Sequence, residues 1–408
     1  MKRKNRLLAL GMALLLLFGC APAEESSAPP PPESPASQSV PEPEAPPEAP
    51  SEPAPEPDRA VLVAVGDNLI HDVIYSQARQ RAGGEGYDFA PAYEHIAPLV
   101  AQGDFAFINQ ETLLAGDELP LSSYPTFCSP TQVGQEMLRL GFNLFSTANN
   151  HSLDWGVRGI RAAGRFWEQQ GDIAMAGCYC TQEEREGVVY LTRNGITAAL
   201  IAATELTNGI PRPEGEVGVL LLNEDRELIL QKLETASQNA DLVILSLHWG
   251  IEGSGWYTDG QRELAQTLAE AGADLILGHH SHVLQGGEYL ETGRGRSYVA
   301  YSLGNFISAQ RGAENMLAGF LRVELEKAPG ANRAEILRVD FTPTVTHYGP
   351  GFRDLTIYPL SQYTPELAAA HGVRQHAPAF GWDYLEDQLA GLDFQTGDMG
   401  DERSDRQL

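Results

Sequence analysis

Three of the ten histidines in this sequence of 408 residues lie within four positions of one another, one residue after an apolar run at residues 275–277. They are His279, His280 and His282. Imidazole is a common protein ligand for divalent cations, so this cluster predicts a metal site. The alternative interpretation is a set of hydrogen-bonded core histidines, because His280 and His282 would alternate along a strand or share a loop without any metal.

Four other apolar runs end in polar residues that can bind a metal. These residues are Asp67, Asn109 with Glu111, Asn150 with His151, and His248. Each of them alone has an ordinary explanation as a turn residue, a helix cap or a hydrogen-bonded core imidazole. The carboxyl ends of strands in an open α/β sheet converge, however, and burying several polar groups there without partners is costly. The five clusters together therefore predict one site.

The combination of ligand types indicates which chemistry such a site supports. Carboxylate, amide oxygen and imidazole suit Mn²⁺, Fe²⁺ or Zn²⁺, and the chain has no cysteine-rich set for a structural zinc. Two such ions about 3.5 to 4 Å apart lower the pKa of a bridging water and hold the entering and leaving oxygens of a phosphoryl or acyl centre. The sequence thus predicts one or two divalent cations and hydrolytic chemistry.

Alternating strands and helices must position these residues. A β-branched apolar run opens the pattern, and an Asn194-Gly195 hairpin signal joins two further apolar runs. The expected strands are 60–67, 105–111, 143–151, 172–177, 188–193, 196–204, 241–250, 274–282, 297–307, 317–326 and 334–348. The expected helices are 91–100, 131–141, 156–171, 223–238 and 259–273, with weaker helical segments at 365–372 and 384–392. This order predicts an α/β protein with added hairpins.

The first 20 residues have the features of a secretory signal. Four basic residues precede an apolar stretch at residues 7–18 that is too short for a comfortable membrane span. Leu17–Cys20 resembles a bacterial lipobox, although Phe18 is bulkier than the usual residue. We therefore expect Cys20 to be lipidated and the protein to be an extracytoplasmic, membrane-anchored lipoprotein of the cell envelope. Ordinary cleavage or an uncleaved anchor is the alternative.

Residues 21–58 form a Pro/Glu-rich segment that contains 14 of the 27 prolines and no aromatic residue. We expect it to be a disordered, semi-stiff spacer. Of the formal charge of −27, the signal contributes +4 and the spacer −9, which leaves −22 on residues 59–408. Residues 59–408 carry enough negative charge that they should repel nucleic acid. The same charge opposes the approach of a polyanionic substrate.

Cysteine usage gives no sign of a disulfide-stabilised or zinc-stabilised fold. Besides Cys20 the chain has Cys128, Cys178 and Cys180, an odd number that leaves at least one thiol without a partner in the chain. The Cys178-Tyr179-Cys180 segment lacks a second pair at zinc-finger spacing. We assign no role to these cysteines.

Six motifs in one order carry a family resemblance. They are GDNLIHD, INQET, TANNHSLDWG, LHWGIE, LGHHSHVLQG and YSLGNF, spread over residues 60–350. This set resembles the bacterial capsule-synthesis CapA family, which is associated with poly-γ-glutamate and is similar in fold to the calcineurin-like metallophosphoesterases. The resemblance implies a four-layer αββα sandwich with mixed sheets at residues 59–350. Residues 351–408 would be a C-terminal extension with a disordered end.

The resemblance also implies roles for individual residues. The implied metal ligands are Asp67, Glu111, Asn150, His248, His280 and His282. His151 would be the proton donor or transition-state stabiliser, with Asp154 orienting it. The metallophosphoesterase pattern begins Asp-x-His, whereas here the first histidine after Asp67 is His71. His71, Asn109 and His279 are therefore additional candidates, with His279 expected outside the ligand set.

The function that follows is a metal-dependent hydrolase or transferase of the cell envelope. It would act in the synthesis, release or attachment of an anionic capsule polymer, with poly-γ-glutamate implied by the resemblance. One alternative is a generic extracytoplasmic metallophosphoesterase for nucleotides or lipid-linked phosphates. Another is a non-catalytic scaffold of a membrane polymer synthase. The expected partners are the membrane, through the lipid anchor, and such a synthase complex.

Overall fold

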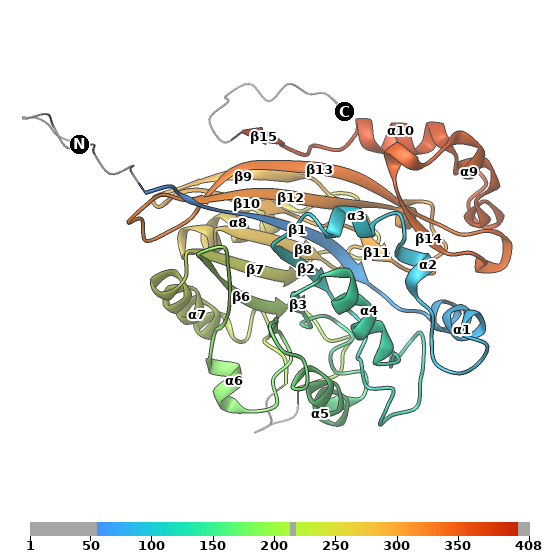
Figure 1. Cartoon of the computed structure of the whole chain (residues 1–408), viewed down its shortest axis with the longest axis horizontal. Helices are drawn as coiled ribbons and strands as arrows, with labels where there is room; N and C mark the ends of the chain where they lie inside the picture. Colours follow the sequence, from blue (N-terminus) through green and yellow to red (C-terminus); the bar gives the residue numbers. More distant parts are fainter. Residues whose placement is uncertain (1–54, 213–217, 399–408) are drawn as a thin grey trace, which may run out of the picture. The chain divides into compact units, whose positions relative to one another are not determined.

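The computed structural model describes residues 55–212 and 218–398. The predicted signal, residues 21–54 of the predicted spacer and residues 399–408 lie outside this part of the chain. Fifteen strands form two mixed sheets in the described part (Figure 1). Each sheet combines a parallel set of strands with antiparallel strands at an edge, as the predicted mixture of crossovers and hairpins requires.

The first sheet has the order β14-β13-β12-β1-β2-β3-β4, with β11 paired to β1 and β15 paired to β13. Its strands are β1 (Asp58–Asn68), β2 (Phe105–Asn109), β3 (Leu144–Ser146), β4 (Ala174–Ala176), β11 (Asn305–Ile307), β12 (Leu317–Lys327), β13 (Glu335–His347), β14 (Thr356–Pro359) and β15 (Gly397–Asp398). Strands β1 to β4 run parallel, and β12, β13 and β14 are antiparallel to their neighbours.

The second sheet has the order β5-β6-β7-β8-β10-β9. Its strands are β5 (Val189–Arg193), β6 (Ile196–Thr204), β7 (Leu242–His248), β8 (Leu275–His279), β9 (Gly287–Thr292) and β10 (Gly295–Ala300). Strands β6, β7, β8 and β10 are parallel. The predicted hairpin joins β5 to β6, and both Asn194 and Gly195 have positive φ, as a tight hairpin turn needs.

Alternate residues of the strands face different hydrophobic cores, and this alternation defines the layers. Leu62 and Ala64 of β1 pack with Leu200 and Ile244 of the second sheet in a core between the sheets. Val63 faces the other side, toward the helices that cover the first sheet. The outer face of the second sheet packs against α7 and α8 in a third core. The molecule is therefore a four-layer αββα sandwich, as predicted.

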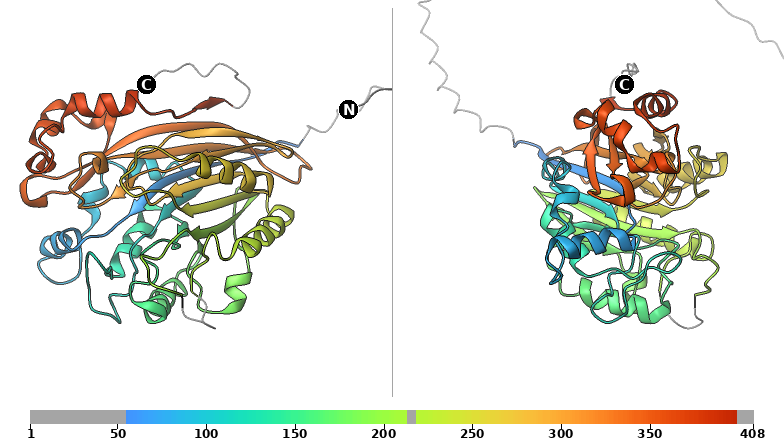
Figure 2. Two further views of the ribbon diagram at one scale, coloured as in Figure 1. Left: turned by 180° about the vertical axis from the view of Figure 1, so that it is seen from behind. Right: turned by 90° about the vertical axis from the view of Figure 1, so that its right-hand side faces the viewer.

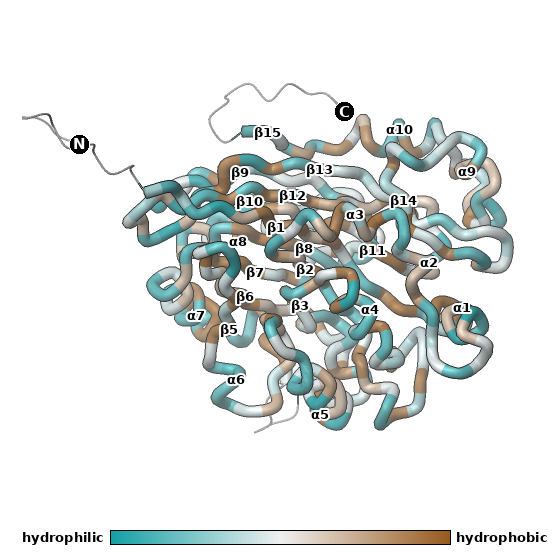
Figure 3. The backbone as a smooth tube through the Cα atoms, in the orientation of Figure 1, coloured by the Kyte–Doolittle hydropathy of each residue, from teal (hydrophilic) through white to brown (hydrophobic). Residues whose placement is uncertain are grey.

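Helices cover the two outer faces. The helices are α1 (Asp72–Arg81), α2 (Ala90–Tyr93), α3 (Ala97–Val100), α4 (Gln132–Leu140), α5 (Gly156–Trp167), α6 (Gln182–Glu186), α7 (Arg226–Asn239), α8 (Asp259–Glu270), α9 (Pro365–Ala370) and α10 (Trp382–Ala390). Apolar residues concentrate in the strands, whereas α6 is hydrophilic and has no buried residue (Figure 3). The periodic helices bury one face each, which explains why their sequences predicted them.

Four local predictions were wrong. The helix expected at 91–100 is two short helices, because Pro98 lacks the amide hydrogen that would continue the first helix and lies in the first turn of the second. The strands expected at 143–151 and 274–282 end at Ser146 and His279, and turns carry the polar residues that follow. The strand expected at 297–307 is β10 and β11 in different sheets, separated by Gly304 with φ 67°.

The segment after residue 350 packs against the sandwich. Helices α9 and α10 lie beside the edge strands of the first sheet (Figure 2). Phe394 stacks on Phe341 of β13 with ring centroids 4.3 Å apart. The backbone of Gln395 accepts a hydrogen bond from Tyr298 of β10 (2.8 Å), so the segment touches both sheets.

Candidate functional site

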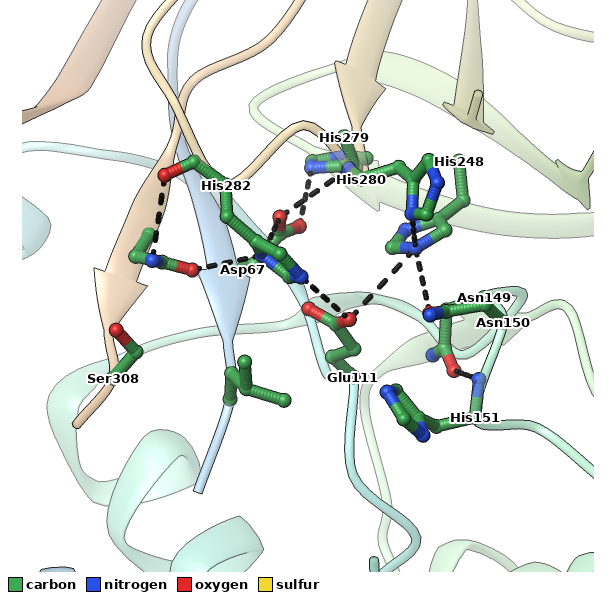
Figure 4. A network of polar contacts seen from close by, with 12 residues as sticks. Asp67, Glu111, Asn149, Asn150, His151, His248, His279, His280, His282 and Ser308 are labelled. Carbon is green, nitrogen blue, oxygen red and sulfur yellow. Dashed lines mark hydrogen bonds and ion pairs between the residues drawn. The ribbon is translucent and has the colours of Figure 1, made fainter. Parts of the chain in front are cut away.

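The carboxyl ends of parallel strands from both sheets meet at one edge of the sandwich. Asp67 of β1 is in register with Asn109 of β2 in the first sheet. His248 of β7 is in register with His279 of β8 in the second sheet. The predicted polar residues from five distant segments therefore lie side by side, and Figure 4 shows most of them in one network.

The first group in this network consists of Asp67, Glu111 and His282. One ligand atom from each of these buried residues lies within 4.8 Å of the others. His282 Nδ1 is 3.2 Å from Asp67 Oδ2, and His282 Nε2 is 3.5 Å from Glu111 Oε1. The group offers two carboxylates and one imidazole to a single point.

The second group consists of His248, His280 and Asn150, and it adjoins Glu111. His248 Nε2 is 2.9 Å from Asn150 Oδ1 and 3.1 Å from His280 Nδ1. The same nitrogen is 3.8 Å from Glu111 Oε1. Glu111 thus lies between the two groups, as a ligand shared by two cations would (Figure 4).

Burial and mutual charge set the protonation of this network. Burial would raise the pKa of Asp67, but the close approach and positive charge of His279 and His282 hold that pKa well below its usual range. Burial raises the pKa of Glu111 well above its usual range. Burial and the neighbouring His280 lower the pKa of His248, which keeps its imidazole neutral and able to ligate.

His282 has the opposite shift. Burial alone would lower its pKa, but the carboxyl groups of Glu111 and Asp67 outweigh burial and raise the pKa to about 9. A cation at this position would supply the positive charge that the two carboxylates otherwise take from His282.

The residues present fit a divalent cation. Glu111 is 1% exposed, and neither of its carboxylate oxygens has a hydrogen-bond partner among the described residues. Buried polar groups of a stable protein are nearly always paired, so such an orphaned carboxylate requires an explanation. Carboxylate, amide and imidazole donors match the preferences of Mn²⁺, Fe²⁺ and Zn²⁺.

His151 and Asp154 form a pair beside the second group. His151 Nδ1 is 2.8 Å from Asp154 Oδ2, which also accepts a hydrogen bond from the Phe127 amide (2.6 Å). The Phe127 ring packs edge-on against His151, with ring centroids 4.7 Å apart. Asn149 holds the turn itself, because its side-chain oxygen accepts from the His151 amide (3.0 Å). The imidazole is therefore fixed on several sides.

The three additional candidates have different positions. Asn109 donates to Asp67 Oδ1 (2.7 Å) and orients that carboxylate. His279 Nδ1 approaches Asp67 Oδ1 at 3.2 Å without hydrogen-bond geometry, and its ring stacks on Phe107. His71 Nδ1 contacts backbone groups of Leu69 and Ala309, so this histidine lies outside both groups.

Asn305, Asn208 and Phe127 are site residues that the sequence did not predict. Asn305 Oδ1 is 3.0 Å from His282 Nδ1 and orients that imidazole. A signal for it existed, since the motif YSLGNF places an asparagine directly after the glycine that separates β10 from β11. Asn208 and Phe127 lie in loops with no periodic pattern, and only the fold brings them to the site.

His280 and His282 have positive φ angles of 90° and 57°. Such a conformation costs an ordinary side chain about 1 to 3 kcal/mol, and it often occurs at functional sites. The turn therefore points the imidazoles of His280 and His282 toward the network. The backbone conformation that this requires lowers the stability of the folded protein.

We expect His280→Gly to unfold at a higher temperature than His280→Ala when both are measured without metal. Glycine tolerates φ of 90°, so the difference should be about 1 kcal/mol in its favour. The control is the same pair of changes at exposed His376, whose φ is −111°. At position 376 the alanine variant should be more stable than the glycine variant. If the alanine variant were also the more stable one at position 280, the proposed backbone strain at His280 would be contradicted.

The described residues thus form a four-layer αββα sandwich with carboxylate, amide and imidazole groups at converging strand ends, the fold that the resemblance to the metallophosphoesterases implied. The chain belongs to the family described as bacterial capsule synthesis protein PGA_cap, which matches residues 61–310.

Two curated relatives are named for capsule synthesis. The PGA biosynthesis protein CapA of Bacillus subtilis (strain 168) is 34% identical over 203 residues, which cover 49% of this chain and 51% of the relative. The capsule biosynthesis protein CapA of Bacillus anthracis is 26% identical over 264 residues, which cover 62% of this chain and 61% of the relative. The matches thus span about half to three fifths of these relatives' lengths.

Solved structures with a similar arrangement are distant. The NAD nucleotidase NadN of Haemophilus influenzae has a TM-score of 0.39 at 12% identity, covering 82% of this chain and 60% of that one. A hypothetical protein from Thermus thermophilus has a TM-score of 0.42 at 14% identity, covering 69% of this chain and 98% of that one.

Proposed function

We propose that this protein is a metal-dependent hydrolase or transferase that acts on an anionic capsule polymer of the poly-γ-glutamate type. The observation that carries the proposal is Glu111, a fully buried carboxylate without a hydrogen-bond partner among the described residues that adjoins two groups of ligand-type side chains. The family and the names of the two relatives support the polymer.

Asp67, Glu111 and His282 would hold one divalent cation. Glu111, Asn150, His248 and His280 would hold a second. A bound Mn²⁺, Fe²⁺ or Zn²⁺ supplies Lewis acidity that polarises a phosphoryl or carbonyl oxygen. Asn109 orients Asp67, and Asn305 orients His282. Residues that hydrogen-bond to metal ligands commonly fix the orientation of those ligands.

His151 is the proposed proton donor. Asp154 accepts a hydrogen bond from Nδ1, which leaves Nε2 as the atom that can exchange a proton with the substrate. Because Asp154 is itself held by the Phe127 amide, the imidazole cannot rotate freely. Burial of His151, which is 5% exposed, keeps bulk water away from the proton.

The proposed location is the outer face of the membrane, with a lipid on Cys20 and residues 21–58 as a spacer. The sequence features of a lipobox and a proline-rich tract support this proposal. Among the described residues no helix has the length and apolar character needed to cross a membrane. A polymer-synthase complex in the membrane is the proposed partner.

A phosphoesterase for small substrates is the second candidate, and the charge of the body favours it. Residues 59–408 carry −22, and the charge of Glu252 acts on Glu111, His280 and His282. A polyanion must approach against this field, whereas a small phosphoester meets less repulsion. Bound cations at the site would offset part of the field for either substrate.

We expect His151→Ala to lower hydrolysis about 100-fold or more with its metal content unchanged, since general acid catalysis contributes about that factor. Asp154→Asn should cause a smaller loss. Hydrolysis would be measured with poly-γ-glutamate and with a panel of phosphomonoesters and phosphodiesters, each with Mn²⁺. Exposed His376→Ala is the matched control.

The substrate panel and a capsule assay separate the candidates. Release of shorter chains from poly-γ-glutamate supports the polymer, and turnover of phosphoesters alone supports the second candidate. Full restoration of capsule by the His151→Ala protein in a deletion strain would contradict catalysis and leave the scaffold role.

A further inference from the structure

A tight turn after β6 reaches the site from the second sheet. Asn208 and Gly209 have φ of 52° and 75°, and the Ile210 amide donates to the Thr207 carbonyl (2.9 Å). Positive φ at both central residues is the type I′ arrangement that Asn-Gly favours. The Thr207 hydroxyl donates to the Ile210 carbonyl (2.6 Å) and closes the turn further. The position of Asn208 is therefore set by a rigid local structure.

The side chain of Asn208 contacts two predicted site residues. Its Oδ1 accepts a hydrogen bond from Asn150 Nδ2 (3.2 Å), and its Nδ2 lies 3.4 Å from His151 Nδ1. Asn150 and His151 follow β3 of the first sheet, so the contact joins the two sheets across the site. Asn208 is exposed, whereas Asn150 and His151 are 3% and 5% exposed. Asn208 thus lies between solvent and the buried pair.

The orientation of the Asn150 amide decides whether this residue can be a ligand. Its oxygen is 2.9 Å from His248 Nε2, within the second group. An amide turned by 180° would present its NH₂ group there, and an NH₂ group cannot bind a cation. Among the described residues, the hydrogen-bond acceptor for Asn150 Nδ2 is Asn208 Oδ1.

We propose that Asn208 is a positioning residue that holds the Asn150 amide with its oxygen toward the second cation position. The proposal rests on the proposed function, because it assumes a cation beside Asn150 and His248. Asn208 acts through Asn150 and does not ligate. Because the turn is rigid, the oxygen of the Asn208 side chain is in place before a cation binds. Little conformational entropy is then lost when the cation binds.

Two changes at Asn208 separate its side chain from its backbone. Asn208→Gly keeps a residue suited to positive φ and removes the acceptor. Asn208→Asp keeps an acceptor oxygen and a residue type that tolerates this conformation. The matched control is Asn194→Gly, since Asn194 also begins an Asn-Gly turn with positive φ but bonds to Asp104, away from the site.

Binding of Mn²⁺ to each purified protein would be measured by calorimetry, with hydrolysis as a second readout. We expect Asn208→Gly to lower the affinity for the second Mn²⁺ about tenfold. This is the lower end of the effect of removing a residue that hydrogen-bonds to a metal ligand. Asn208→Asp should bind at least as tightly as the wild type, and Asn194→Gly should bind as the wild type does. Wild-type binding by Asn208→Gly, or equal weakening by Asn208→Asp, would overturn the proposal.

Asn150→Ala separates this proposal from the proposed function. Weakened Mn²⁺ binding by Asn150→Ala together with unchanged binding by Asn208→Gly rejects only the positioning role. Unchanged binding by Asn150→Ala rejects the second cation position and, with it, the two-cation site of the proposed function.

Discussion

Glu111→Gln should remove nearly all stabilisation by metal while the metal-free protein stays folded. Glutamine has the shape of glutamate without its charge, so the metal-free variant loses the ion pairs with His282 and His248 but no hydrogen bond among the described residues. A cation, in contrast, would lose the one ligand that both groups share. The change should therefore abolish metal binding without preventing the protein from folding.

The size of the effect follows from mass action. A ligand present at about 1,000 times its Kd stabilises the folded state by roughly 4 kcal/mol. The wild type should therefore unfold at a clearly higher temperature with Mn²⁺ than with a chelator, and Glu111→Gln should show almost no difference. The control is Glu263→Gln on the exposed face of α8, which should respond to Mn²⁺ as the wild type does.

Either of two results would contradict the assignment of Glu111. One is a wild-type response of Glu111→Gln to Mn²⁺, which would place the metal elsewhere. The other is unfolding of Glu111→Gln without metal, which would show that the carboxylate has a structural role. Elemental measurement of bound metal after dialysis gives an independent reading of the first result.

Gly66→Ala and Gly278→Ala should each strongly destabilise the fold. A Cβ at Gly66 would lie 1.9 Å from the Gly304 carbonyl oxygen, and a Cβ at Gly278 would lie 1.9 Å from the Tyr301 carbonyl oxygen. Both contacts are with backbone, which cannot move aside as a flexible side chain can. We expect a loss of about 3 kcal/mol or more from each change, at the upper end for overpacking.

These two glycines explain how the site is assembled. Gly66 directly precedes Asp67, and Gly278 directly precedes His279. The two glycines allow β1 and β8 to approach the segment that connects β10 of the second sheet to β11 of the first. Gly171→Ala is the matched control, because nothing lies within 4 Å of its added Cβ and its φ is ordinary. Denaturant unfolding would be compared for the three variants. Wild-type stability of Gly66→Ala would contradict the close approach.

Local patterns were enough to predict the fold class and the residues that meet at the site. Apolar runs, the Asn194-Gly195 turn and amphipathic helices depend on neighbours in the sequence, so they can be recognised without the structure. Polar residues at the ends of parallel strands converge within a sheet, which explains why Asp67 and Glu111 were found together. His248 joins them because the strand ends of the second sheet meet the same edge of the sandwich. Their role as metal ligands stays a prediction.

Only the tertiary structure decided which neighbours hold these residues. The division of the segment 297–307 between two sheets, the acceptor that Asn208 offers to Asn150, and the approach of His279 to Asp67 depend on contacts between residues far apart in sequence. Such contacts leave no periodic signal, because a single asparagine in a loop has the same local pattern whether it faces solvent or a buried amide. The physical reason is that side-chain chemistry is local, whereas the geometry that makes it useful comes from the packing of two sheets.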